Sequence, residues 1–177
     1  MRRGSVILSI AVLPWTLSAV WAADPCDGFT WNVAQERALF AAPPHAQAAA
    51  SDAGHAPAVA TERLYELTLM AQDQLHFAVP PGKSDLHKDA YGGLVRFRVP
   101  ADGVFRVSID QPVWVDVVAD GKLVQSKDFR GQRGCSAPHK VVEFVLPGKQ
   151  DLLLQFSNAA NRQVRVTVTP SAPTKSS

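Results

Sequence analysis

The chain has 177 residues, with 18 Lys and Arg against 16 Asp and Glu and a formal net charge of +2. Arg2 and Arg3 make up this excess and precede an apolar run over positions 6–20. This order predicts a secretory signal peptide over residues 1–22, cleaved after Ala22. The remaining chain is formally neutral, which excludes a basic nucleic-acid-binding protein and a polybasic membrane-surface protein. No later apolar run reaches the roughly 18 residues of a membrane-spanning helix.

The two cysteines of the chain, Cys26 and Cys135, are an even count in a chain that we expect to be exported. In an oxidising compartment such a pair typically forms a disulfide. A metal site and a reactive thiol are the alternatives, but neither cysteine has a Cys-x-x-Cys or Cys/His ligand spacing. The predicted disulfide ties the N-terminal segment to a late loop, and Trp31 is expected to anchor that segment beside Cys26. We therefore expect a soluble periplasmic or secreted protein.

The N-terminal segment, residues 23–41, contains one short predicted helix. Asn32 followed by Gln35 resembles a capping box, and helix-compatible residues continue for about two turns. Residues 42–60 are almost only Ala, Pro, His, Gln, Ser, Asp and Gly, a composition typical of a linker or surface loop. Residues 171–177 are predicted to be a disordered tail.

From residue 61 to residue 170, apolar residues alternate with polar ones, as in strands that bury one face. Gly, Pro, Asp and Asn residues separate these sets and supply the turns. Eight or nine short antiparallel strands of this kind predict an all-β fold, a single β-sandwich or jelly-roll domain. The alternating sets are Tyr65, Leu67 and Leu69; Leu75, Phe77 and Val79; Val95, Phe97 and Val99; Phe105, Val107 and Ile109; Val113, Val115 and Val117; Val142, Phe144 and Leu146; and Val164, Val166 and Val168.

One turn in this domain allows a strand register to be predicted. Asp120-Gly121 is typical of a two-residue type I′ turn, so Ala119 is expected to face Lys122 across a hairpin. The register of the preceding strands depends on whether they follow one another as neighbours in one sheet.

If those strands form a meander, the alternation places Arg96, Arg106 and Asp116 in one row on the outer face, with Trp114 beside Lys127. Two arginines directly opposite each other are destabilising unless an anion or a carboxylate shares them. The row is therefore a candidate face for binding an anion or a sugar acid, with Trp114 as a stacking platform. A solvated charge ladder and a tryptophan that packs in the core or at a sheet edge are the alternatives.

A second candidate site depends on His139 and Glu143. Their spacing resembles half of the metal motif of the cupins, a family of β-barrel iron dioxygenases and related proteins. The motif needs another histidine at a position where this chain has Ala137, so His76 or His87 would have to complete a two-histidine, one-carboxylate iron site. A surface histidine at the start of a strand is the alternative.

The region from residue 94 to residue 169 also resembles a known family. The matching segments are 97–107, the turn Asp120-Gly121, 151–156 and 164–168. These resemble the pre-peptidase C-terminal domains, small β-sandwiches appended to secreted bacterial enzymes. The resemblance implies a noncatalytic binding or accessory module, which we expect here to stand without an attached catalytic domain.

These observations favour an exported β-sandwich that acts as a noncatalytic binding or accessory module and needs no cofactor. Its expected partner is a carbohydrate, an envelope polymer or another exported protein. A small cupin-like metal-dependent enzyme, such as a non-haem iron dioxygenase, is one alternative. A structural envelope component without a small ligand is the other. The oligomeric state does not follow from the sequence.

Overall fold

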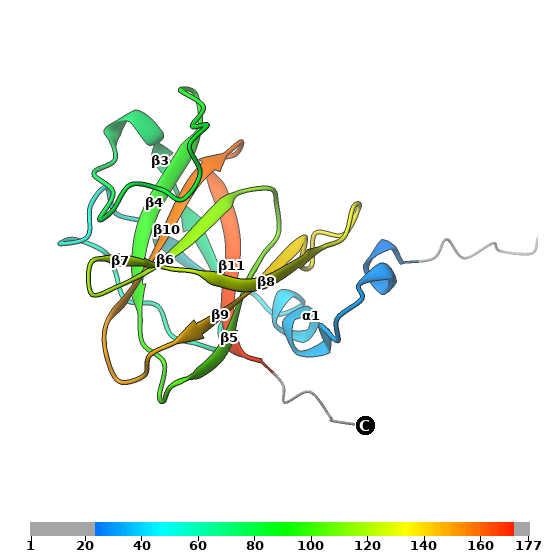
Figure 1. Ribbon diagram of the computed structural model, residues 1–177. Helices are drawn as coiled ribbons and strands as arrows, with labels where there is room; N and C mark the ends of the chain where they lie inside the picture. The colour runs from blue at the N-terminus through cyan, green and yellow to red at the C-terminus, as the bar shows by residue number, and fades with distance from the viewer. Residues whose placement is uncertain (1–23, 172–177) are drawn as a thin grey trace, which may run out of the picture.

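The computed structural model describes residues 24–171, so the predicted signal peptide and residues 172–177 of the predicted tail lie outside it. Two β-sheets face each other across an apolar core (Figure 1). The described residues form eleven strands rather than eight or nine, with one short α-helix and two 3₁₀ turns. Their bounds are η1 (Pro25–Gly28), α1 (Ala34–Phe40), β1 (His45–Ala48), β2 (Tyr65–Thr68), β3 (Met70–Ala71), η2 (Gln72–Gln74), β4 (Tyr91–Phe97), β5 (Gly103–Ile109), β6 (Trp114–Ala119), β7 (Lys122–Val124), β8 (Ser126–Gly131), β9 (Lys140–Leu146), β10 (Leu152–Ala159) and β11 (Gln163–Pro170).

The sheets are mainly antiparallel, and each contains strands from distant parts of the chain. The six-stranded sheet has the order β1-β2-β11-β5-β9-β8, and the five-stranded sheet has the order β3-β4-β10-β6-β7. Alternation in the sequence gives each strand one apolar face, and these faces meet in the core, where Phe97, Phe144 and Phe156 are buried. The predicted all-β sandwich is confirmed at this level.

The predicted meander is wrong, because consecutive strands lie in different sheets. β4 belongs to the five-stranded sheet, β5 to the six-stranded sheet, and β6 returns to the five-stranded sheet. Arg96 therefore lies opposite Leu153 of β10, while Arg106 lies opposite Glu143 of β9. The apolar period fixes which face of a strand is buried, but it does not determine which strand lies beside it.

The register of the hairpin at Asp120-Gly121 is the one predicted from the sequence. The Asp120-Gly121 turn joins β6 to β7, and Ala119 pairs with Lys122. Both turn residues have positive φ angles, 49° and 70° respectively, as a type I′ turn requires.

The N-terminal segment covers the outer face of the six-stranded sheet. The predicted disulfide between Cys26 and Cys135 is present, and it joins positions 109 residues apart. Figure 1 shows α1 beside this sheet, near β5 and β9. Glu36 of α1 is buried. The predicted capping box is not formed, because the Gln35 amide donates to Glu62 instead.

Residues 42–60 contain one strand and run along the sandwich. β1 pairs with β2 in parallel, so the six-stranded sheet begins at His45. Small side chains permit close backbone approach here, since a Cβ atom on Gly93 would lie 2.5 Å from Cβ of Ala49. No helix within residues 24–171 is long and apolar enough to cross a membrane.

Candidate binding site between the sheets

A cavity of about 390 Å³ lies where the chain passes from one sheet to the other. β7 is the edge strand of the five-stranded sheet, and β8, which follows after a single residue, is the edge strand of the six-stranded sheet. The two sheets separate at this point and leave the end of the core accessible. Gln125 is the residue at which the chain crosses between them.

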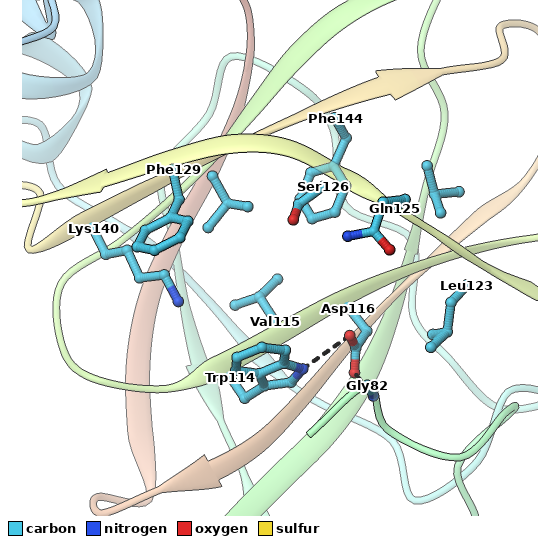
Figure 2. A pocket seen from close by; sticks show the side chains of 12 residues that line it. Gly82, Trp114, Val115, Asp116, Leu123, Gln125, Ser126, Phe129, Lys140 and Phe144 are labelled. Atoms are coloured by element: carbon cyan, nitrogen blue, oxygen red, sulfur yellow. Dashed lines mark hydrogen bonds between the residues drawn. The ribbon is translucent and has the colours of Figure 1, made fainter. Parts of the chain in front are cut away.

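The floor of this cavity is apolar, and its rim is aromatic. Val115, Val142 and Phe144 are buried residues that form part of its lining. Figure 2 shows Trp114 on one side of the cavity and Phe129 on the other, with the end of the Lys140 side chain between them. Phe129 is 60% exposed, which is unusual for a residue whose strand partner, Val142, is buried. The opening of the sandwich thus leaves aromatic surface available to a ligand.

Asp116 fixes the orientation of the Trp114 ring. The indole Nε1 donates to Oδ1 of Asp116 at 2.9 Å, and the backbone nitrogen of Gly82 donates to Oδ2 at 3.0 Å. Asp116 is buried, so these two bonds compensate for part of the desolvation of its carboxylate. Trp114 and Asp116 are two positions apart on β6, which places both side chains on one face.

Lys140 extends between the two aromatic rings. Its Nζ atom lies 5.5 Å from the centroid of the Trp114 ring and 5.7 Å from that of Phe129, within range of cation–π attraction. Burial lowers the pKa of Lys140; the charge of Asp116 raises it, the charge of Lys83 lowers it, and the net pKa lies below the ordinary value of 10.5. Among the described residues, no carboxylate forms an ion pair with Lys140.

Two further polar side chains line the cavity at the crossing between sheets. Figure 2 shows the Gln125 amide and the Ser126 hydroxyl on the wall opposite Asp116. Neither side chain makes a hydrogen bond to protein within residues 24–171. The amide supplies two donors and an acceptor, and the hydroxyl supplies one donor and acceptor lone pairs. These groups are available to a polar ligand.

The structure brings together only two of the five residues predicted for the binding face. Trp114 and Asp116 line the cavity, whereas Arg96 is exposed on β4, beside a different hollow. Arg106 and Lys127 lie on the outer face of the six-stranded sheet, beside Glu143. The row Arg96–Arg106–Asp116 is not formed, because its members lie on three strands that are not neighbours.

Phe129 and Lys140 line the cavity but were not among the residues predicted from the sequence. Phe129 is the one aromatic residue in the polar strand Ser126–Gly131, and this contrast is a signal that could have identified it. Lys140 carries no comparable signal, because a lysine at the start of a strand is common on any protein surface.

Glu143 belongs to a buried polar cluster under the N-terminal segment. Its carboxylate accepts hydrogen bonds from Nε of Arg106 at 3.0 Å and from the Ser171 hydroxyl at 2.7 Å. Burial alone would raise the pKa of Glu143, but these two bonds and the charges of Arg106 and Lys127 hold it below its ordinary value. Nη1 of Arg106 also lies 3.4 Å from Oε1 of Glu36. The carboxylate of Glu143 is therefore fully engaged within the protein.

The four residues of the metal hypothesis do not gather at one point: His87 and His139 line the same hollow, but Glu143 is engaged by Arg106 on the outer face of the six-stranded sheet. β9 begins at Lys140, so the strand alternation does not extend back to His139, whose Nδ1 lies 3.3 Å from the carbonyl oxygen of Cys135. His76 forms an isolated β-bridge with Asp52, and His87 lies in a loop. No cluster of three or more His, Cys, Asp or Glu side chains suited to a metal occurs in the part of the chain that the structure describes.

Comparison with known proteins adds no family. No protein-family model matches the chain, and no curated protein matches it significantly. The resemblance of residues 94–169 to pre-peptidase C-terminal domains stays a prediction from the sequence. The geometry of the cavity is therefore the basis for assigning a function.

Proposed function

We propose that this protein is an exported, noncatalytic binding module that holds a carbohydrate in the cavity between β6 and β8. The observation that carries the proposal is the combination of two opposed aromatic rings, Trp114 and Phe129, with the unpartnered side chains of Gln125 and Ser126. A sugar ring presents apolar C–H faces and polar hydroxyl edges. Aromatic walls suit the faces, and a few placed polar groups suit the edges.

The size of the cavity fits this ligand class. A volume of about 390 Å³ lies at the lower end of the usual range for small-molecule sites, roughly 300–1,000 Å³. One or two sugar residues of a longer polymer would fill it. The apolar floor excludes water from the stacked face, which strengthens the hydrogen bonds at the rim.

Two observations support a binding role in an exported protein. The Cys26–Cys135 disulfide is of a kind that persists in oxidising compartments, in agreement with the signal-peptide pattern of residues 1–22. In the cavity, Asp116 is held by two donors, and within residues 24–171 the Ser126 hydroxyl has no hydrogen bond to a base. These groups are arranged to bind a ligand rather than to activate a nucleophile.

A glycan array probed with the mature protein, followed by calorimetry on the oligosaccharides that bind, tests the proposal. Trp114→Ala and Phe129→Ala are each expected to weaken binding about tenfold, because each removes one stacking wall. Val145→Ala is the matched control, since Val145 is 58% exposed on the neighbouring strand β9 but lies outside the cavity. Absence of glycan binding, or equal effects of all three substitutions, contradicts the proposal.

A second candidate is the binding of an extended segment of another exported protein. Phe129 and Leu123 are exposed apolar side chains on adjoining edge strands, and edge strands can pair with an added strand. Hydrogen exchange distinguishes the two candidates. An added strand protects the backbone amides of β8, whereas a sugar in the cavity leaves their exchange nearly unchanged.

A further inference from the structure

A second hollow, of about 270 Å³, adjoins the cavity at Trp114. Trp114 and Lys140 line both hollows, so a ligand stacked on Trp114 can extend from one into the other. The second hollow is lined by basic side chains: Lys83, His87 and His139 accompany Lys140. We name these four residues the basic recess.

The two lysines of the basic recess lie close enough to repel each other, since the charge of Lys83 lowers the pKa of Lys140. Nζ of Lys83 lies 5.8 Å, and Nζ of Lys140 5.5 Å, from the centroid of the same Trp114 ring. Within residues 24–171 neither lysine forms an ion pair. The charge of Asp116, whose oxygens accept from the neutral N–H groups of Trp114 and Gly82, offsets part of the repulsion between the lysines, but one carboxylate does not balance two lysines. Like charges kept close together cost free energy that a bound anion recovers.

The remaining groups of the basic recess are held in place from outside it. The carbonyl oxygen of Cys135 lies 3.3 Å from Nδ1 of His139, which leaves Nε2 available to a ligand. Asn158 fixes the loop that carries His87: its Oδ1 accepts from the His87 backbone nitrogen at 2.8 Å, and its Nδ2 donates to the Asp85 carbonyl at 2.6 Å. The basic recess is thus arranged before any ligand binds, which lowers the entropic cost of binding.

We propose that the carbohydrate bound by this protein is acidic, and that its carboxylate or phosphate group binds between Lys83 and Lys140 while a sugar ring stacks on Trp114. This assignment rests on the proposed function. The sequence predicted that Arg96 and Arg106 bind an anion. In this proposal Lys83 and Lys140, which the fold brings together, bind it instead. The chain without residues 1–22 is formally neutral, so recognition of an acidic polymer must come from a local site of this kind.

The test uses pairs of ligands that differ only in charge. Oligosaccharides of glucuronate, galacturonate and mannuronate are compared with their methyl esters, and a phosphorylated oligosaccharide forms a separate arm. The acidic forms are expected to bind at least about tenfold more tightly than the esters, and more weakly as salt concentration rises. A preference for the phosphorylated arm over the uronates also supports the inference and identifies the anion as phosphate.

Single substitutions test which side chains bind the anionic group of the ligand. Lys83→Gln and Lys140→Gln are each expected to weaken binding of the acidic ligand about tenfold and to change the affinity for the ester by less than about threefold. Lys122→Gln is the matched control, because Lys122 is an exposed lysine of the adjacent strand β7 that lines neither hollow. Equal affinity for acids and esters, with no effect of the lysine variants, overturns the acidic ligand but leaves the carbohydrate function standing. If no sugar of either kind binds, the proposed function fails and the acidic ligand fails with it.

Discussion

Two tryptophans of this protein each lie beside a pair of cationic side chains, but their surroundings differ. At Trp31 the guanidinium carbons of Arg106 and Arg130 lie 4.8 and 5.1 Å from the ring centroid. Arg106 is also bonded to the Glu143 carboxylate, and Arg130 lies 2.6 Å from a neighbouring aspartate. The N-terminal segment that carries Trp31 closes this group of charges against the six-stranded sheet.

At Trp114 the corresponding cations are lysines, and in the part of the chain that the structure describes they have no paired carboxylate. Trp114 is half-buried, and Phe129 on the opposite wall of the cavity is 60% exposed. Under the proposed function, tryptophan and cations serve two purposes in one fold. Where carboxylates form ion pairs with the cations, the group attaches a segment to the sheet; where no ion pair forms, the cations would bind a ligand.

Removal of the disulfide is expected to have the largest effect on stability, because the disulfide attaches the N-terminal segment that covers the charges around Trp31. We call the group at Trp31 the closed site. A Cys26→Ala, Cys135→Ala double variant should lose about 4–5 kcal/mol of unfolding free energy, since the bridge closes a loop of 109 positions in the unfolded chain. Urea denaturation measures this loss. Ligand affinity measured on the folded protein should change by less than about threefold, because the N-terminal segment does not line the cavity and the contact of His139 with the Cys135 carbonyl oxygen is the link between the disulfide and the basic recess. A large drop in affinity would contradict the separation of the two sites.

Removal of the carboxylate that completes the closed site should have the next largest effect. Glu143→Ala leaves the half-buried Arg106 without its nearest carboxylate, and we expect a loss of about 3 kcal/mol in unfolding free energy. Asp151→Ala is the matched control, because it breaks an exposed ion pair with Arg98 and should cost less than about 1 kcal/mol. Equal losses of unfolding free energy in the two variants would show that burial does not increase the contribution of the ion pair between Glu143 and Arg106.

The same carboxylate predicts an acid-sensitive component of stability. The pKa of Glu143 in the folded protein lies below its ordinary value of 4.5, so the folded state favours the ionised form. The resulting stabilisation is fully present above that ordinary value and is lost as the pH falls through the lower, folded-state pKa. Denaturation of wild type and Glu143→Gln from pH 6 to pH 3 measures this component. The variant should show the shallower dependence on pH, and parallel curves would exclude the effect.

The sequence predicted those parts of the fold that depend on nearby residues. The alternation of Phe105, Val107 and Ile109 predicted a strand with one buried face, and an even cysteine count predicted the disulfide. Arg96 and Arg106 were placed together because their strands are consecutive, yet those strands lie in opposite sheets. A strand shows the same alternation of apolar and polar residues whichever strand lies beside it, so the order of strands in a sheet could not be derived from this alternation.

In the candidate site, too, contacts between residues close in sequence were predictable, and contacts that depend on strand order were not. Trp114 and Asp116 are two positions apart on one strand, so their proximity is a local property and was predictable. Phe129 and Lys140 lie on the paired strands β8 and β9, and they come near Trp114 of β6 and the loop of Lys83 because the chain changes sheets after β7. No pattern within any one of these segments indicates the others. Their association is a consequence of topology.

The smallest expected effect concerns the lysine shared by the two hollows. Burial keeps the pKa of Lys140 below its ordinary value, so its charged form is disfavoured by the fold, and this cost applies fully at neutral pH. Lys140→Met retains an unbranched chain between the two rings and removes the charge. The free energy of unfolding should therefore rise by between zero and about 1 kcal/mol, as expected when a residue serves binding rather than stability.

Lys122→Met on the exposed face of β7 provides the reference, and should change stability by less than about 0.5 kcal/mol. Urea denaturation of both variants makes the measurement. If Lys140→Met instead destabilised the protein by several kcal/mol, Lys140 would be holding the fold together as Arg106 does. The two tryptophan sites would then differ only in exposure, and the unpaired charge at Trp114 would no longer indicate a ligand.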